Sequence, residues 1–120
     1  QVVHDYGLIH EDEIFCLETT RDSKWLYTGS NDRFVYTISI EDRQFDRAVG
    51  PPTRYGISAM KITADEKKLL VEDNLGHLKL LSLRNGEVIK DYGCLNAVGG
   101  ITGIVITADQ KFLFTSSSDN

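Results

Sequence analysis

Residues 62–68 read ITADEKK and residues 106–112 read ITADQKF, so one segment of the chain returns almost unchanged. Thr20, Thr63 and Thr107 align when the chain is compared with itself, at spacings of 43 and 44 residues. Asp-Tyr-Gly also occurs twice, at residues 5–7 and 91–93. A period of this length is typical of a four-stranded unit repeated along a chain. The sequence therefore predicts a repeat protein.

Each repeat carries the signals of four β-strands separated by short polar turns. The second strand of each repeat is a nearly continuous apolar run, so we expect neighbouring sheets to cover both of its faces. Asp-Ser at 22–23, Asp-Glu at 65–66 and Asp-Gln at 109–110 supply the turn before that strand. The expected strands are 13–19, 25–29, 34–40 and 44–48, then 57–62, 68–72, 77–83 and 87–91, then 101–106 and 112–116, with 1–6 as the outer strand of a preceding unit.

The two cysteines do not form a disulfide framework, and an intracellular, reduced, cytoplasmic setting is expected. Cys16 shares its repeat position with Ala59 and Gly103, which are also small, so we interpret it as a packing residue in a crowded strand. Cys94 is expected in a loop. Neither cysteine has a second ligand at metal-binding spacing, so no metal and no cofactor is predicted.

The charge of the chain restricts its partners. The net charge is −5, whereas nucleic acids and anionic membranes are bound by basic faces, so we expect neither as a partner. A hydrophobic content of 41% and a charged content of 26% are typical of a folded soluble domain. No run is long enough to span a membrane and no targeting segment is visible. Because the sequence begins at Gln1, we expect a processed or excerpted product.

The repeats resemble WD40 repeats, the family of closed β-propellers. The segment LYTGSNDRFVYTISIEDRQ at 26–44 is similar to that family's second strand, tight turn with an aspartate, and third strand. The Trp-Asp dipeptide that names the family is replaced by Ile38-Ser39 in the first repeat and by Leu81-Ser82 in the second. The resemblance covers almost the whole chain and rests on periodicity more than on individual motifs.

The resemblance implies a structural hydrogen-bond network in which a histidine, a hydroxyl residue, an aspartate and a tryptophan fix the tight turn to the sheet. The corresponding residues are His10, Thr28 and Asp32 in the first repeat, with Ile38 in place of the tryptophan, and Thr115 and Asp119 in the third repeat. In the second repeat Val71 and Leu75 replace the hydroxyl and the aspartate, so the network is expected to be absent there. His10 with Asp32 is interpreted as structural, not as a catalytic pair.

The predicted fold is all-β: a β-propeller of four-stranded antiparallel blades, of which about two and a half are present. Residues 1–6 are assigned to the preceding blade, 7–49 to the first repeat, 50–92 to the second and 93–120 to a truncated third. Propellers hide their strand edges by closing a ring, and stacked repeats need neighbours to cover their apolar faces. We therefore expect the remaining blades to come from a longer chain, or additional copies to close the ring.

WD40 propellers are platforms on which other proteins or peptides dock, so the resemblance implies a non-enzymatic interaction scaffold. The acidic cluster at 10–13 is a candidate site for a basic peptide, and a solvated loop is the alternative interpretation. Tyr55 beside Arg54 is a stronger contact candidate, because aromatic residues and arginine dominate interface energetics. The expected partner surface comprises Glu11, Asp12, Asn31, Arg33, Arg54, Tyr55 and His77.

Two alternatives remain open at this point. A structural role in a large ciliary or cytoskeletal assembly would use the outer strands and blade rims. A lactonase-like enzymatic propeller would need carboxylates or histidines around the axis, where this sequence places apolar or small residues apart from Glu18 and Lys61. Those two side chains are expected to face different environments. No known catalytic motif is present, so no catalytic residue is predicted.

Overall fold

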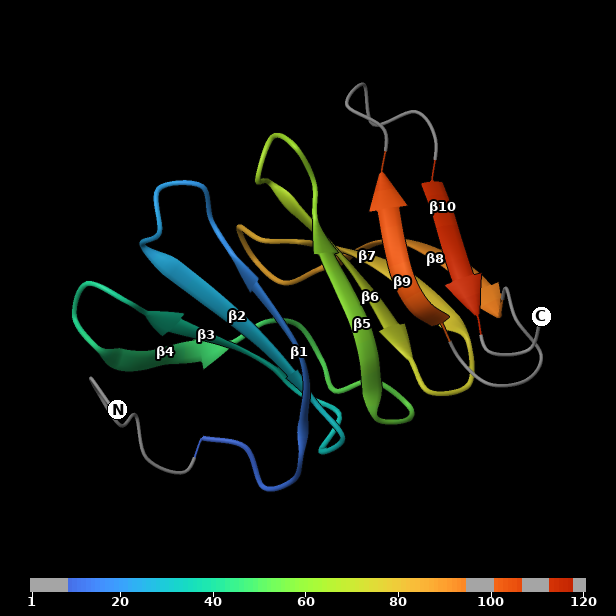
Figure 1. Ribbon diagram of the computed structural model, residues 1–120, viewed down its shortest axis with the longest axis horizontal. Helices are drawn as coiled ribbons and strands as arrows, with labels where there is room; N and C mark the ends of the chain where they lie inside the picture. The colour runs from blue at the N-terminus through green and yellow to red at the C-terminus, as the bar shows by residue number, and fades with distance from the viewer. Residues whose placement is uncertain (1–8, 95–100, 107–112, 118–120) are drawn as a thin grey trace.

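The computed structural model describes residues 9–94, 101–106 and 113–117, and the regular structure in these segments is entirely β-strand (Figure 1). Two four-stranded antiparallel sheets, in the orders β1-β2-β3-β4 and β5-β6-β7-β8, are followed by the antiparallel pair β9-β10. The all-β prediction is thereby confirmed. The strands are β1 (Ile14–Thr19), β2 (Trp25–Ser30), β3 (Val35–Ser39), β4 (Gln44–Ala48), β5 (Ile57–Ile62), β6 (Lys68–Asp73), β7 (His77–Ser82), β8 (Val88–Cys94), β9 (Ile101–Ile106) and β10 (Leu113–Ser117).

Seven of the ten strands begin or end at residues other than those predicted, and β3 and β8 illustrate the differences. Phe34 precedes β3, because its amide donates a hydrogen bond of 3.0 Å to the Asp32 carboxylate and so belongs to the turn. Cys94, which was expected in a loop, instead ends β8 and lies opposite His77 in β7. Residues 1–6, predicted as an outer strand, lie outside the described residues.

The repeated Thr-x-Asp sequence forms the same turn in the first two sheets. The Thr20 and Thr63 hydroxyls donate to Asp22 and Asp65, respectively, over 2.6 Å in both cases. Each threonine hydroxyl also accepts the amide of the first residue of the next strand, at 3.2 Å from Trp25 and 3.1 Å from Lys68. These bonds satisfy polar groups that the change of direction would otherwise leave unpaired. The third copy, at 107–112, lies outside the described residues.

The main hydrophobic core lies between the two four-stranded sheets. The first sheet and the segment after it supply Tyr27, Val35 and Val49. The second sheet supplies Ile57, Met60, Leu69, Val71 and Leu81, and Leu83 follows its strand β7. A smaller cluster of Ala59, Leu70 and Leu78 is separate from this core. Most of β2 and nearly all of β6 are buried, as the apolar runs in the sequence predicted.

Gly29 shows how closely the first two sheets approach. A Cβ atom at this position would lie 2.7 Å from Cys16 Sγ and 2.8 Å from Ile57 Cγ2. Those separations are shorter than real carbon contacts, so only glycine fits without displacement of its neighbours. Cys16 is partly buried and packs against the main core, in agreement with its interpretation as a packing residue.

The corresponding strands β1 and β5 have the same irregularity but different surroundings. A register shift separates Ile14 from Cys16 in β1, and another separates Ile57 from Ala59 in β5. Ile14 is 49% exposed, whereas the equivalent Ile57 is fully buried. The second sheet is covered here by the first sheet. In the described part of the chain, nothing covers β1 to the same extent.

The turns lie at two opposite edges of the sheets (Figure 1). We call one the Thr-Asp edge; it contains turns 20–24 and 63–67 and segments 40–43 and 83–87. The Ile40 amide donates to the Lys24 carbonyl and the Leu83 amide to the Lys67 carbonyl, so each segment begins beside one of the turns. We call the other the histidine edge; it contains segments 10–13, 31–34, 50–56 and 74–77. All residues of the expected partner surface belong to the histidine edge.

Candidate functional site

His10 is the centre of a buried hydrogen-bond network at the histidine edge. Its Nδ1 lies 2.9 Å from Asp32 Oδ2, and its Nε2 lies 2.5 Å from Thr28 Oγ1. His10 is 3% exposed and its ring stacks on Tyr36 with 4.6 Å between centroids. A neutral imidazole satisfies all three groups, because Nδ1–H donates to the carboxylate while Nε2 accepts the threonine hydroxyl. The three residues assigned to this network by sequence therefore meet in space.

Asp32 connects this network to the turn that follows β2. Its carboxylate accepts the amides of Phe34 and Glu11, each over 3.0 Å, in addition to the contact with His10. Burial alone would raise the pKa of Asp32, but these hydrogen bonds hold it below the ordinary value. The network therefore fixes segment 10–13 to the turn 31–34.

The second sheet uses a different aspartate for the corresponding turn. Asp73 Oδ1 accepts the amides of Leu75 and His77 at 2.9 and 3.1 Å, and the Asp73 carboxylate also contacts His77 Nδ1 at 3.1 Å. Asp73 is 2% exposed. The WD40 resemblance places the hydroxyl residue and the aspartate at positions 71 and 75, where this chain has Val71 and Leu75. The sequence therefore predicted a turn without an aspartate that accepts its amides. The signal that sequence reasoning missed is the spacing of Asp73 and His77 across the turn.

Thr115 and Asp119 are the network residues predicted for the third repeat. Thr115 lies in β10 opposite Ile104 of β9, as its place in the second strand of a repeat predicts. Its side chain, and all of Asp119, lie outside the described residues.

The expected partner surface is continuous across the first and second sheets. Asn31 Nδ2 donates to Asp12 Oδ2 over 2.8 Å, and Asn31 Oδ1 accepts from Asn74 over 3.3 Å. The Arg33 carbonyl accepts the Thr53 amide at 2.9 Å, which connects the turn after β2 to the segment before β5. Glu11, Asp12, Asn31, Arg33 and Arg54 are exposed, and Tyr55 and His77 are half-buried.

An aromatic and cationic stack occupies the second-sheet side of this surface. The Tyr55 and His77 rings stack with 6.0 Å between centroids, and the Arg54 guanidinium lies 5.6 Å from the Tyr55 centroid. Beside the stack is a cavity of about 160 Å³, lined by Thr53, Arg54, Val71, Asp73, His77, Lys79 and Asp91. Lys79 and Asp91 were not predicted from the sequence; they face each other as cross-strand partners in β7 and β8.

Gly56 allows the two asparagine side chains to meet. A Cβ atom at Gly56 would lie 2.7 Å from Asn74 Nδ2 and would overlap Asn31 Oδ1. The Gly56 carbonyl also accepts the Asn74 amide at 2.8 Å. A larger residue would therefore separate the turns that carry the surface.

Among the described residues, no cluster of three or more His, Cys, Asp or Glu side chains is spaced to hold a metal ion. Burial, followed by the charge of Glu18, raises the pKa of the Cys16 thiol to about 12, so it is not ionised at neutral pH. Lys61 Nζ lies 3.8 Å from Glu18 Oε1. The expectation that Glu18 and Lys61 face different environments is therefore wrong, because adjacent β1 and β5 bring them together.

Glu72 is the most unusual acidic residue of the described chain. It is fully buried, and within the described segments neither carboxylate oxygen has a hydrogen-bond partner. Burial, reinforced by the negative charge of Asp73, raises its pKa to about 8. Sequence reasoning placed Glu72 in an apolar strand and did not anticipate this.

Comparison with known proteins adds no named relative. Among the described residues, no helix is long and apolar enough to cross a membrane. No protein-family model matches this chain, and a search of curated proteins returns no significant match.

Proposed function

We propose that the chain is a WD40-like segment of a β-propeller and serves as a non-enzymatic scaffold for protein–protein interaction. Three features support the propeller: sheets that recur with the sequence period, equivalent register shifts in β1 and β5, and the contact of His10 with Thr28 and Asp32. The outward face of β1 would pack against a further blade, from a longer chain or another copy.

The observation that carries the proposed function is the continuity of the histidine edge. Segments 10–13, 31–34, 50–56 and 74–77 are separated in sequence, yet side-chain hydrogen bonds connect Asp12 to Asn31 and Asn31 to Asn74. A surface fixed in this way loses little conformational entropy when it binds a partner. The exposed Arg54 beside Tyr55 supplies the residue types that are enriched in binding hot spots.

The first-sheet end of the surface favours a basic partner segment. Glu11 and Glu13 are exposed, and neither carboxylate has an ion-pair partner among the described residues. Asp12 is different, because its carboxylate already accepts from Asn31 and from the Glu13 amide. We therefore expect Glu11 to contribute more to an electrostatic contact than Asp12.

The test compares proteins retained from a cell lysate by the full chain and by two variants, with quantitative mass spectrometry as the readout. The variant Arg54→Ala/Tyr55→Ala removes the stack from the histidine edge. The control Arg43→Ala/Gln44→Ala alters two exposed residues beside the Thr-Asp edge. A partner that is lost with the first variant and kept with the second supports the proposal. Retention of the same proteins by both variants, each folded by circular dichroism, would overturn it.

A further inference from the structure

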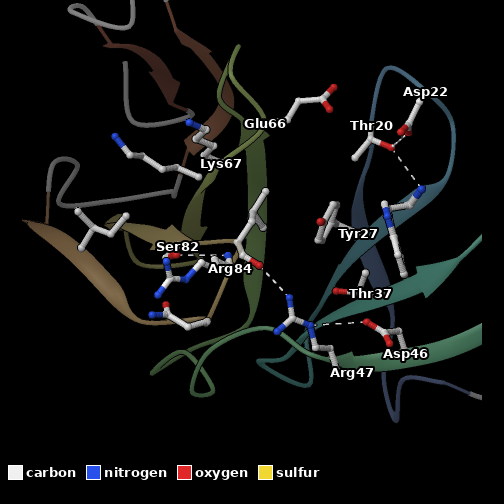
Figure 2. Close-up of a pocket in the computed structure, with 15 residues that line it drawn as sticks. Thr20, Asp22, Tyr27, Thr37, Asp46, Arg47, Glu66, Lys67, Ser82 and Arg84 are labelled. Carbon is white, nitrogen blue, oxygen red and sulfur yellow. Dashed lines mark hydrogen bonds and ion pairs between the residues drawn. The ribbon is translucent and has the colours of Figure 1, made fainter.

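The facing walls of the two four-stranded sheets enclose a groove of about 750 Å³ near the Thr-Asp edge, away from the surface described above. The first sheet supplies Trp25, Tyr27, Thr37 and Arg47, and the second supplies Lys68 from β6 and Arg84 from the turn after β7. Figure 2 labels Tyr27, Thr37, Arg47 and Arg84. We propose that this groove binds an acidic peptide segment, with one carboxylate held by Arg47 and Thr37 and further negative charges near Lys67, Lys68 and Arg84.

Tyr27, Thr37 and Arg47 form a continuous cross-strand row. Tyr27 lies opposite Thr37, and Thr37 lies opposite Arg47, in the register of β2, β3 and β4. All three line the groove, and Figure 2 shows them on the wall that faces the second sheet. A phenol, a hydroxyl and a guanidinium in one row form a set of hydrogen-bond donors for an oxyanion.

Thr37 is the member of the row whose buried hydroxyl is left unpaired by the fold. It is 3% exposed, and its hydroxyl oxygen has no hydrogen-bond partner among the described residues. Buried hydroxyls are normally paired, because an unpaired one loses its hydration without compensation. A carboxylate that enters beside Arg47 would supply the missing acceptor.

Arg47 has donors to spare. One guanidinium nitrogen, Nη2, donates to the Leu83 carbonyl over 2.8 Å and so connects the two sheets. Its Nε lies 3.6 Å from Asp46 Oδ2. The guanidinium carries five N–H donors in a planar fork, and the side chain is 45% exposed, so a carboxylate can reach the remaining donors.

The groove has a local excess of available positive charge, although the chain carries a net charge of −5. Three carboxylates line it: Asp22 accepts from Thr20, Glu66 pairs with Arg21 from outside the groove, and Asp46 lies 3.6 Å from Arg47. By contrast, the side chains of Lys67, Lys68 and Arg84 make no ion pair within the described chain. The four cationic side chains of the groove therefore outnumber its three carboxylates by one, which favours an anionic ligand.

A peptide fits these observations better than a nucleic acid or a small anion. A nucleic acid is bound through an extended basic face that contacts many phosphates, whereas the cations here belong to one groove of a chain with a net charge of −5. The cations are distributed over two sheets and a turn, and the groove runs between the sheets with Trp25 on one wall. Pockets for small ligands enclose most of the ligand surface, whereas this groove is open to solvent. An extended acidic segment can contact both walls at once.

The test measures fluorescence anisotropy of a fluorescein-labelled oligoglutamate peptide titrated with the full chain. We expect saturable binding that weakens with salt, and no binding of an oligoglutamine peptide of equal length. Arg47→Gln should weaken binding about tenfold, because it removes a charge-assisted hydrogen bond. Thr37→Val should weaken binding about threefold, while the urea midpoint stays the same or rises, because the hydroxyl has no partner in the fold.

The control variant is Arg33→Gln, which removes an exposed arginine from the histidine edge. It should leave the peptide affinity unchanged. The proposal is overturned if oligoglutamate does not bind, if Arg33→Gln weakens binding as much as Arg47→Gln, or if Thr37→Val lowers stability without changing affinity. Competition by inorganic phosphate at the same concentrations as the peptide would identify a site for small anions and would likewise overturn it. None of these outcomes depends on the partner proposed for the histidine edge.

Discussion

Leu17 and Met60 occupy equivalent positions in β1 and β5, yet Leu17 is 60% exposed and Met60 is 7% exposed. Each residue follows the register shift of its strand, and they lie opposite Thr28 and Val71, respectively. Met60 packs into the main core between the first two sheets. The difference in exposure therefore comes from the neighbouring sheet and not from the strands themselves, and Leu17 is placed to pack as Met60 does.

Substitution of these two residues should have unequal effects. Met60→Ala should cost about 2–5 kcal/mol of unfolding free energy, because it opens a cavity in the core. Leu17→Ala should change it by less than about 1 kcal/mol, because most of the side chain already contacts water. Urea unfolding of both variants measures the difference. Equal losses would show that β1 is covered in solution.

His10→Ala should lower the unfolding free energy by about 1–3 kcal/mol, because it removes a buried ring and leaves the Thr28 hydroxyl without its partner, while Asp32 keeps the Glu11 and Phe34 amides. Thermal and urea unfolding provide the measurement. The matched control is His77→Ala, which also leaves an aspartate with two backbone amides, but His77 is only half-buried and contacts no threonine hydroxyl among the described residues. Unchanged melting of His10→Ala would contradict the structural role assigned to this histidine.

Thr20→Val should destabilise the chain by about 1 kcal/mol, because the turn loses the hydroxyl that contacts Asp22 and Trp25. Thr63→Val should have the same effect through the equivalent bonds. The neighbouring exposed Thr19 provides the control, since Thr19→Val removes a hydroxyl for which no hydrogen bond is found in the described chain. Chemical denaturation of the three variants separates a specific turn bond from a general effect of valine.

Glu72 should make stability depend on pH. Its pKa is about 8 in the folded protein against an ordinary value of 4.5, so the folded state binds the proton more tightly than the unfolded state. Stability is therefore highest below about pH 4.5 with respect to this group, and it is lost as the pH rises through 8.

Glu72→Gln should remove that dependence and raise the melting temperature at pH 8 while leaving it nearly unchanged at pH 4.5. The exposed Glu87→Gln serves as the control and should reproduce the pH profile of the original chain. Parallel profiles for the original chain and Glu72→Gln would rule out Glu72 as the source of the pH effect.

The repeat period and the apolar runs were sufficient to predict the strand order, because period and hydrophobicity are properties of the local sequence. The contact of His10 with Asp32 was also accessible, through a resemblance whose residues are present in the first repeat. Two contacts of the folded chain could not be predicted from the sequence. Asp73 supports its turn from a position two residues earlier than expected, and Lys61 reaches Glu18 because separate sheets are adjacent.

The groove residues were missed for a related reason. Tyr27, Thr37 and Arg47 are ten residues apart at each step, and only the pairing of β2, β3 and β4 aligns them. Nothing in a linear sequence marks Thr37 as lacking a partner, because hydroxyl pairing depends on every surrounding atom. The same limit applies to the burial of Glu72.

The Thr-Asp turns complete their own hydrogen bonding within a few residues. In the first sheet, Thr20 contacts Asp22 and Trp25, and the Asp22 carboxylate also accepts the Lys24 amide at 3.0 Å. A copied segment therefore carries the threonine and aspartate bonds that close the turn, although the Arg21 amide also donates to Glu66 of the neighbouring turn. Duplication of the unit could therefore preserve the turn while the strands on either side adapted to different contacts. These local hydrogen bonds give a physical reason why threonine and aspartate recur at the repeat spacing although the Trp-Asp dipeptide is absent.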